Sequence, residues 1–281
     1  MKSNFLFFVA LLLFAACSKK EHKITDLSGL RGGKTFAVPT GTIADQFVKK
    51  KFPDARIIYL NNVLDCALAV KGGKAEAAVY DQPVLQNIAA KNEGLLVLPE
   101  LLVDDQYGFA VQLKDVALKT TMDEVLAELK ANGTYEEMMK RWFPQKGSPA
   151  PMPEITNKGG NGVLRFGTAA VTEPMSFMDG KRKVVGFDIE FAAYIARKLN
   201  KKLDIIDMEF GAMLPALIAG KVDMIGAGLS ITEERAKKVL FSKSYYPSGI
   251  AALVKVNTES TPKQGQRKKK VKNKWVVNNF A

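Results

Sequence analysis

Alternating apolar and polar segments predict a chain built from alternating strands and helices. In the first part, short apolar runs have the length and β-branched content of buried strands, and the segments between them have helical spacing. We expect strands at 34–40, 56–60 and 77–80, and helices at 43–52 and 62–70, the latter capped by Asn62. This βαβαβ order predicts a mostly parallel sheet with helices on both faces.

The pattern then continues to residue 143. We expect a helix at 83–91, a strand at 95–98, and a short strand at 107–111 after an acidic turn. Two helices follow, an amphipathic one at 121–130 that ends at Asn132-Gly133 and a second at 135–142. Residues 144–162 are rich in proline, glycine and polar residues without periodicity, which is typical of a linker.

A second βαβαβ pattern begins at Val163. Its strands are expected at 163–168, 203–208 and 222–227, and its helices at 187–199 and 213–219. The chain therefore contains two similar α/β halves.

The amino terminus has the features of a secretory signal. Lys2 precedes an apolar run from Phe5 to Ala16 that is short for a membrane span, and Cys17 follows two alanines. We expect residues 1–17 to be a lipoprotein signal peptide with lipid on Cys17, and residues 18–29 to be a tether. The alternative is a plain cleaved signal, because Phe14 stands where the lipoprotein pattern prefers leucine.

Charge and composition exclude several classes of function. Residues 255–281 hold eight Lys or Arg and one Glu, so most of the net charge of +12 lies in this basic tail, which we expect to be disordered. The α/β part is only mildly basic, so no nucleic-acid partner is expected. With His22 as the single histidine, neither a zinc cluster nor a Ser-His or Cys-His pair is expected. No cofactor is implied, and Cys66, inside an apolar run, is expected to be a small buried residue.

Residues 223–242, DMIGAGLSITEERAKKVLFS, combine features that suit an anion. The expected strand at 222–227 runs into a glycine-bearing loop and then into a helix whose first turn holds Arg235. Ligands bind at the carboxyl ends of strands in open α/β sheets, and helix amino termini favour anions. An arginine can hold a carboxylate through two parallel hydrogen bonds. The stretch therefore suggests a carboxylate clamp, although an ordinary turn with a solvated arginine has the same spacing.

The same stretch carries a family resemblance. The segments LRFGTAAVTEPMSF, VVGFDIEFAAYIARKL and MLPALIAGKVDMIGAGLSITEERAKKVLFSKSYYPSG, within 163–254, resemble the first lobe of family 3 solute-binding proteins, which deliver polar amino acids to ABC importers. The resemblance implies an α/β, two-lobed periplasmic-binding-protein type II fold, each lobe a mostly parallel sheet flanked by helices.

The resemblance also implies a ligand site. Arg235 matches the arginine that holds the ligand carboxylate, with Ser230 beside it, and the Gly228 carbonyl would accept from the ligand ammonium. Asp81 in YDQP matches the counter-ion of the ammonium, Thr42 matches the carboxylate-binding loop, and Phe210 matches an aromatic packed on the ligand. Each of these residues also has a structural explanation. Asp81 could cap the helix before Pro83, Thr42 could be a turn residue, and Phe210 could only fill the core. Ala169 and Thr172 stand where many relatives have an aspartate and a second aromatic.

The order of the segments departs from the family. The resemblance makes 30–104 a second-lobe unit, 105–143 the closing strand and helices of the first lobe, and 163–254 the first lobe itself. Since the closing segment precedes the first lobe, the chain is interpreted as circularly permuted, with the linker joining the old termini and one interlobe crossing left open. A slice of a tandem array would have the same order.

The function that the resemblance implies is binding, not catalysis. Two lobes would close around an amino acid or similar zwitterion and present it to an ABC permease, on a lipid-anchored protein in the periplasm or cell envelope. A dehydratase-like enzyme is the alternative, with Glu173 as its only obvious acid or base. The other alternative is that the chain is a truncated fragment that binds no ligand.

Overall fold

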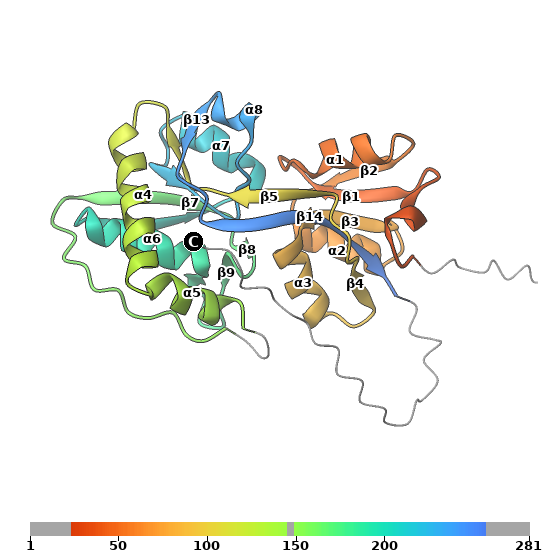
Figure 1. Ribbon diagram of the computed structural model, residues 1–281, viewed down its shortest axis with the longest axis horizontal. Helices are drawn as coiled ribbons and strands as arrows, with labels where there is room; N and C mark the ends of the chain where they lie inside the picture. Colours follow the sequence, from red (N-terminus) through yellow and green to blue (C-terminus); the bar gives the residue numbers. More distant parts are fainter. Residues whose placement is uncertain (1–23, 145–148, 257–281) are drawn as a thin grey trace, which may run out of the picture.

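The computed structural model describes residues 24–144 and 149–256, which form two α/β lobes connected by two long strands (Figure 1). We name each lobe by one residue, the Asp81 lobe and the Arg235 lobe. The predicted mixed α/β class, with sheets flanked by helices, is confirmed and is consistent with the type II periplasmic-binding fold. The predicted signal, Cys17 and residues 257–281 of the basic tail lie outside the described residues.

The Asp81 lobe is built on a sheet of order β2-β1-β3-β14-β4. Its first three strands are parallel, as expected for βαβαβ, while β14 runs antiparallel to β3 and β4. All five residues of β3 are buried, as in a strand covered on both faces. The elements are η1 (Leu27–Leu30), β1 (Thr35–Pro39), α1 (Ala44–Lys51), β2 (Arg56–Leu60), α2 (Val63–Lys71), β3 (Ala77–Asp81), α3 (Gln82–Lys91), β4 (Leu95–Val97) and β14 (Tyr246–Lys255).

The Arg235 lobe has a sheet of order β11-β7-β12-β6-β13 and a small sheet of order β10-β9-β8. Strand β6, from the first part of the chain, lies antiparallel between β12 and β13, and α4 and α5 share a core with α6. Its strands are β6 (Ala110–Gln112), β7 (Val163–Thr168), β8 (Val171–Thr172), β9 (Ser176–Met178), β10 (Val184–Val185), β11 (Lys202–Asp207), β12 (Met224–Ile225) and β13 (Val239–Phe241). Its helices are α4 (Val116–Ala131), α5 (Thr134–Trp142), α6 (Phe187–Lys198), α7 (Phe210–Ile218) and α8 (Glu233–Ala236).

Two antiparallel strands carry the chain between the lobes. β5 (Val103–Tyr107) runs from the Asp81 lobe towards β6, and β14 returns from the Arg235 lobe. They pair from Tyr246 opposite Tyr107 to Ile250 opposite Val103, and Figure 1 shows them side by side between the lobes. Both interlobe crossings are therefore present, and the expectation that one of them is left open was wrong. The resulting two-stranded ribbon is the connection about which the lobes can move.

Local signals explain where the helices begin and end. The Asn62 side chain accepts a hydrogen bond from the Asp65 amide, which confirms the predicted cap of α2. Gly133 has φ +80°, a left-handed conformation that suits glycine, and it separates α4 from α5 as predicted. Sequence signals thus placed most of the elements correctly.

Several predicted elements were wrong in extent. The acidic turn before residue 107 is instead strand β5, because Asp104 and Asp105 alternate between an exposed and a half-buried position against β14. The strand at 222–227 covers only Met224–Ile225, and α7 begins at Phe210 and contains Pro215. Leu27 and Leu30 are buried in the core, so packed structure begins inside the predicted tether.

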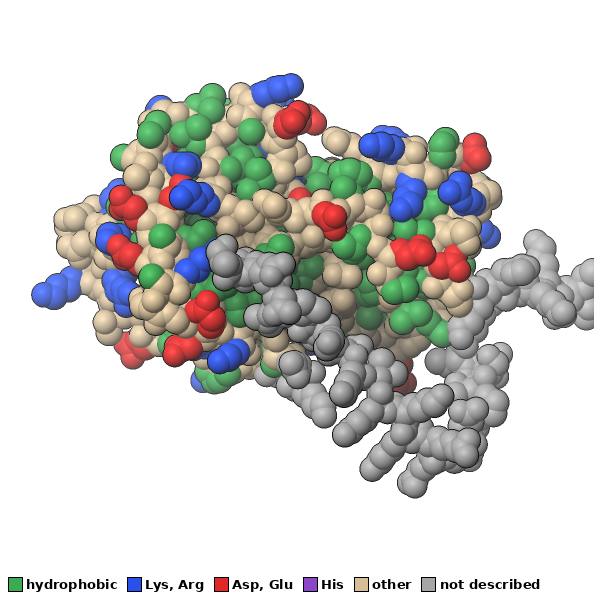
Figure 2. Space-filling view, in the orientation of Figure 1, with side chains coloured by type: hydrophobic (Ala, Val, Ile, Leu, Met, Phe, Trp, Pro, Cys, Tyr) green, Lys and Arg blue, Asp and Glu red, His purple; other side chains and the backbone are tan. Residues whose placement is uncertain are grey.

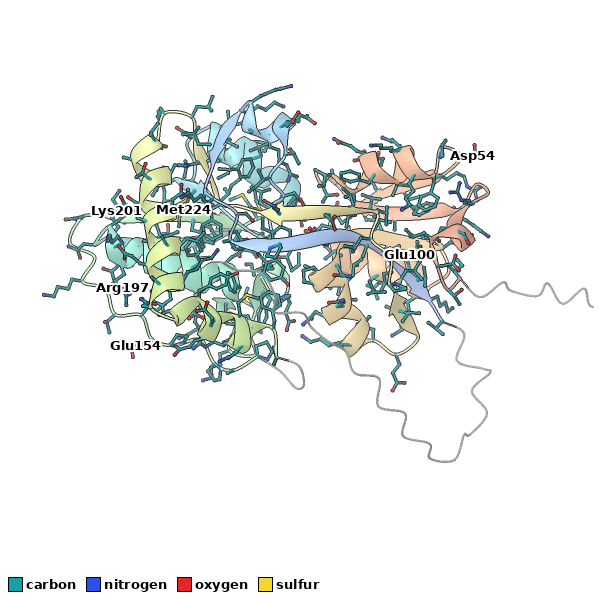
Figure 3. All side chains as sticks on the ribbon, viewed as in Figure 1. Asp54, Glu100, Glu154, Arg197, Lys201 and Met224 are labelled. Carbon is teal, nitrogen blue, oxygen red and sulfur yellow. The ribbon has the colours of Figure 1, made fainter. Side chains whose placement is uncertain are left out.

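The core of each lobe is apolar and its surface carries both signs of charge. Met224 lies within the Arg235 lobe, whereas Arg197 and Lys201 lie at its outer edge (Figure 3). The face in Figure 2 shows acidic and basic side chains on both lobes. Cys66 is fully buried, as predicted, and burial raises the pKa of its thiol to about 12. Within 24–144 and 149–256, none of the helices has the length and apolar character needed to span a membrane.

Candidate functional site

Arg235 lies where the two lobes meet. It is in the short helix α8, where Thr232 caps the helix by accepting from the Arg235 amide, and its side chain is buried. Nη1 donates to the carbonyl of Ser230 at 2.9 Å, and Nη2 donates across to the carbonyl of Gly41 in the other lobe at 3.1 Å. Burial lowers the pKa of the guanidinium, and the charges of Asp81 and Asp105 oppose this change. A buried cation at this position can bind an anion.

Asp81 supplies the opposite charge from the other lobe. It follows Tyr80 at the carboxyl end of β3 and is 4% exposed. Its carboxylate makes no capping hydrogen bond to α3, so the capping role is not observed; instead Oδ1 accepts from the Tyr107 hydroxyl at 2.7 Å. Burial, reinforced by the charge of Asp105, raises the pKa of Asp81 to about 8. A ligand ammonium would relieve this cost.

Gly228 and Ser230 lie on the loop that leads from β12 to α8. Gly228 has φ +65°, and its amide donates to Oδ2 of Asp188 at 2.8 Å. A Cβ at Gly228 would lie 3.2 Å from the Tyr107 ring, so the glycine allows the loop to approach the crossing strand. Ser230 is 4% exposed and forms a β-bridge with Tyr107. Asp188 is therefore a buried support of this loop that the sequence interpretation missed.

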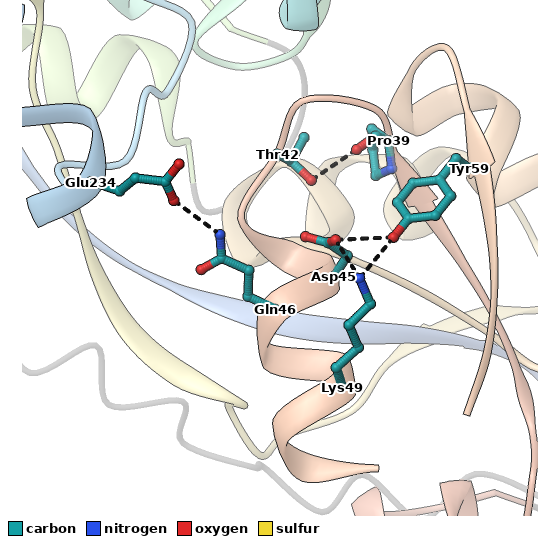
Figure 4. Close-up of polar contacts among 7 residues, drawn as sticks. All are labelled: Pro39, Thr42, Asp45, Gln46, Lys49, Tyr59 and Glu234. Atoms are coloured by element: carbon teal, nitrogen blue, oxygen red, sulfur yellow. Dashed lines mark hydrogen bonds and ion pairs between the residues drawn. The ribbon is translucent and has the colours of Figure 1, made fainter. Parts of the chain in front are cut away.

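Thr42 lies on the loop between β1 and α1, and its hydroxyl donates to the Pro39 carbonyl at 2.9 Å (Figure 4). That hydrogen bond belongs to the turn, which was the alternative explanation for this residue. Thr42 also lines an interlobe pocket of about 320 Å³ together with Gly41, Gln46, Glu234 and Arg235. Two of the predicted residues, Thr42 and Arg235, thus face one pocket from opposite lobes.

The two lobes are in direct contact beside this pocket. A Cβ at Gly41, which has φ +80°, would lie 2.5 Å from the Cα of Gly211, so the backbones approach as closely as glycine allows. Nε2 of Gln46 donates to Oε2 of Glu234 across the lobes at 3.4 Å, as Figure 4 shows. Lys91 and Glu173 form a further interlobe ion pair. The arrangement is a closed one.

Phe210 is the first residue of α7 and is buried at the same contact. Its ring meets that of Tyr80 from the other lobe edge to face, with centroids 6.4 Å apart. The Arg235 guanidinium lies 5.8 Å from the Phe210 centroid. Phe210 thus places an apolar ring beside the Arg235 guanidinium, in addition to its contacts in the core. Ala169 and Thr172 are also buried, and the Thr172 hydroxyl donates to the Ala169 carbonyl.

The crossing strands contribute residues that sequence reasoning missed. Tyr107 is fully buried; its hydroxyl donates to Asp81 and accepts from the Ser248 hydroxyl at 2.8 Å. Asp105, two residues earlier on β5, is electrostatically coupled to both Asp81 and Arg235. Asp105 and Tyr107 are two positions apart, a spacing that places both side chains on one face of a strand. The sequence interpretation missed this pattern because it assigned the acidic pair to a turn.

Comparisons with known proteins find one matching family model and several relatives that match part of this chain. Residues 164–278 match the family described as "Bacterial extracellular solute-binding proteins, family 3". The glutamine-binding protein GlnH of Bacillus subtilis (strain 168) is 29% identical over 128 residues, which are 45% of this chain and 46% of that protein. The L-cystine-binding protein TcyJ of Escherichia coli (strain K12) is 35% identical over 102 residues, 36% of this chain and 38% of its own length.

A third relative has a higher identity over a shorter segment. The probable arginine-binding protein ArtJ of Chlamydia trachomatis serovar D is 40% identical over 90 residues, which cover 32% of this chain and 35% of ArtJ. The chain thus spans less than half the length of these curated relatives. Residues 164–278, which are less than half of this chain, are therefore similar to family 3 of the bacterial extracellular solute-binding proteins.

Proposed function

We propose that this chain binds an amino acid between its two lobes and presents it to an ABC importer. The observation that carries the proposal is the pairing of a buried cation, Arg235, with a buried carboxylate, Asp81, on opposite sides of the interlobe contact. A zwitterion has a partner for each charge in such a site, and burying either charge unpaired would be costly. The names of the relatives, which include glutamine-, arginine- and cystine-binding proteins, support the same class of ligand.

The proposed mechanism is closure of the lobes about β5 and β14. Arg235 and Ser230 would bind the carboxylate together with the Thr42 loop, while Asp81 and the Gly228 carbonyl would bind the ammonium. Because Arg235 and Asp81 belong to different lobes, only the closed form offers both charges at once. Phe210 would cover the ligand side chain. A permease that recognises the closed form would then receive only a loaded protein.

The location and the chain order are parts of the same proposal. A signal with lipid on Cys17 would anchor the protein in the cell envelope, facing away from the cytoplasm. For the order of the segments we propose circular permutation. Leu27 and Val254, near the two ends of the described chain, pack in one cluster of the Asp81 lobe, which supports an opened connection there.

The enzymatic alternative has less support. Glu173, its candidate acid or base, forms an ion pair with Lys91 and is partly exposed at the contact between the lobes. This carboxylate already has the Lys91 ammonium as its partner, whereas a general acid or base must contact the reacting group of a substrate. We therefore propose binding and not catalysis.

The proposal is tested by thermal-shift titration of the purified chain against single L-amino acids. A ligand at a hundredfold its dissociation constant should stabilise the protein by about 2.7 kcal/mol. Arg235→Ala should abolish the shift, because the ligand carboxylate would be buried without its partner. The matched control is Arg197→Ala, whose guanidinium stacks on Tyr194 away from the site. A shift that survives in Arg235→Ala, or its absence for every amino acid, would refute the proposal.

A further inference from the structure

Gly228 has a buried carbonyl to which the described part of the chain supplies no donor. The residue lies on the loop between β12 and α8 and is buried. Its carbonyl accepts no hydrogen bond from any residue in 24–144 or 149–256. Buried backbone carbonyls are nearly always paired, so an unpaired one beside a binding pocket indicates a place for a donor from outside the chain. In the proposed function this donor is the ligand ammonium.

Hydrogen bonds on both sides of this carbonyl fix its direction. The Gly228 amide donates to Oδ2 of Asp188 at 2.8 Å. The next carbonyl along the chain, that of Leu229, accepts from the Gly108 amide at 3.0 Å. Gly108 follows the crossing strand β5, so the loop is attached to α6 on one side and to the crossing strand on the other. Of these two hydrogen bonds, the one to Asp188 depends on a side chain, and a substitution can therefore remove it.

Asp188 is itself held in place. It is the second residue of α6 and is completely buried, and its amide donates to the Met175 carbonyl at 2.9 Å. The Tyr245 hydroxyl interacts with its carboxylate. The Tyr245 ring stacks on that of Phe187, with centroids 5.7 Å apart. The carboxylate thus holds the Gly228 amide from a fixed position.

The fold alone does not account for a carboxylate at this position. Burial raises the pKa of Asp188 to about 7, which reflects the cost of removing its charge from water. Glu190, on the same helix, is paired with Arg141, whereas Asp188 forms no ion pair with any residue in 24–144 or 149–256. Well-packed apolar side chains often replace buried charged groups without loss of stability. The hydrogen bond to the Gly228 loop is therefore what the carboxylate adds.

We propose, on the basis of the binding function proposed above, that Asp188 is a positioning residue that determines how strongly the site selects for an α-ammonium. By holding the Gly228 amide, it keeps the Gly228 carbonyl aimed at the ammonium before the ligand arrives. Such preorganisation raises affinity, because the loop need not be ordered on binding. The ligand carboxylate is bound by Arg235 and the Thr42 loop. Loosening Gly228 therefore weakens the binding of an amino acid and leaves the binding of a carboxylic acid without the ammonium nearly unchanged.

The test compares an amino acid with the carboxylic acid that lacks its α-ammonium. The L-amino acid with the largest thermal shift is used; for L-arginine the partner is 5-guanidinopentanoic acid, and for L-glutamine it is 4-carbamoylbutanoic acid. Isothermal titration calorimetry of the purified chain gives the ratio of the two dissociation constants, the weaker acid being measured in competition with the amino acid. If no L-amino acid binds to the parent chain, the proposed function fails and this inference fails with it.

Substitutions on α6 then test the role of Asp188. Asp188→Ala should reduce the preference for the amino acid at least tenfold, which corresponds to about 1.4 kcal/mol. Asp188→Asn should keep the preference within about threefold of the parent, because its amide oxygen can still accept from Gly228. The matched control is Glu190→Ala, which removes a buried carboxylate of the same helix and should leave the preference unchanged.

Two outcomes would refute the inference while the proposed function stands. One is an equal loss of affinity for both ligands in Asp188→Ala, and the other is a loss of preference in Asp188→Asn as large as in Asp188→Ala. Should Asp188→Ala fail to fold, Tyr245→Phe removes the hydroxyl that contacts the carboxylate but keeps the ring packed against Phe187 and Phe191. We expect the preference to fall about threefold or more in Tyr245→Phe, and an unchanged preference would refute the role of Asp188.

Discussion

Ligand binding should release a proton from Asp81. Burial and the neighbouring Asp105 raise the pKa of this carboxyl to about 8 in the ligand-free protein, against 3.8 for an ordinary aspartate. A ligand ammonium needs the ionised form of Asp81 as its partner. At pH 6 a group with this pKa is ionised in about 1% of molecules, and at pH 8 in about half. Because the apparent dissociation constant scales inversely with the competent fraction, affinity should rise about 50-fold between pH 6 and pH 8.

The stability of the ligand-free protein should change in the opposite direction. Since the folded pKa of Asp81 is raised, the folded state binds the proton more tightly than the unfolded state between pH 4 and pH 8. Its contribution to stability is fully present below pH 4 and is lost as pH rises through 8, with a slope of up to about 1.4 kcal/mol per pH unit. Asp81→Asn should remove this contribution, because an amide does not titrate.

Calorimetry in buffers of different ionisation enthalpy measures the released proton. The L-amino acid with the largest thermal shift is titrated at pH 6, 7 and 8, and we expect close to one proton released per ligand at pH 6. Tyr107→Phe removes the hydrogen bond that lowers the pKa of Asp81, so it should move the pH dependence upward. An affinity that is equal at pH 6 and pH 8, with an enthalpy independent of the buffer, would show that Asp81 is not the titrating counter-ion.

Two further variants test the interlobe contact and the core. Gly41→Ala should weaken amino-acid binding at least tenfold by calorimetry, because its Cβ would lie 2.5 Å from Gly211. The control Gly73→Ala is also at positive φ, but its added Cβ has open space around it, so it should bind normally. Equal affinities of the two variants would contradict the closed contact. Glu190→Ala should lower the free energy of unfolding by about 1–3 kcal/mol in a denaturant melt, because Arg141 and Trp142 both donate to this buried carboxylate. Glu136→Ala, at an exposed position of α5, should cost less than 0.5 kcal/mol or so, and a similar loss in both would contradict this reasoning.

The sequence allowed most of the fold to be predicted because the helices and strands have strong local signals. Hydrophobic periodicity located both βαβαβ units, and a cap and a glycine marked boundaries at Asn62 and Gly133. The last strand, β14, was not predicted, although the segment after Tyr246 is apolar and contains Ile250 and Val254. Its partners β3, β4 and β5 all come from the first part of the chain, and long-range pairing is not visible in a local pattern.

The candidate site was predictable in part for the same reason. The six residues proposed from the resemblance come from both lobes. The hydrogen bond from Arg235 to the Gly41 carbonyl connects the parts of the two lobes in which these residues lie. Asp105 and Tyr107 were missed because their importance depends on β5 crossing between the lobes beside β14. A pair of aspartates before an aromatic residue has the local features of a turn, and only pairing with a distant strand turns it into one face of a ribbon.

Closure of such a site depends less on the order of the segments along the chain than on the presence of both strands that cross between the lobes. The proposed ligand contacts come from the β1–α1 loop, the end of β3, and the loop before α8, and the crossing strands β5 and β14 connect the two lobes that carry them. In a circular permutant the opened connection, between Val256 and Ile24, would lie at the end of β14 in the Asp81 lobe, where Val256 donates to the Gly94 carbonyl. Both crossing strands remain paired, so the motion that brings Arg235 towards Asp81 has the same two-stranded hinge. We therefore expect permutation to preserve closure, and loss of the pairing between Tyr107 and Tyr246 to abolish it.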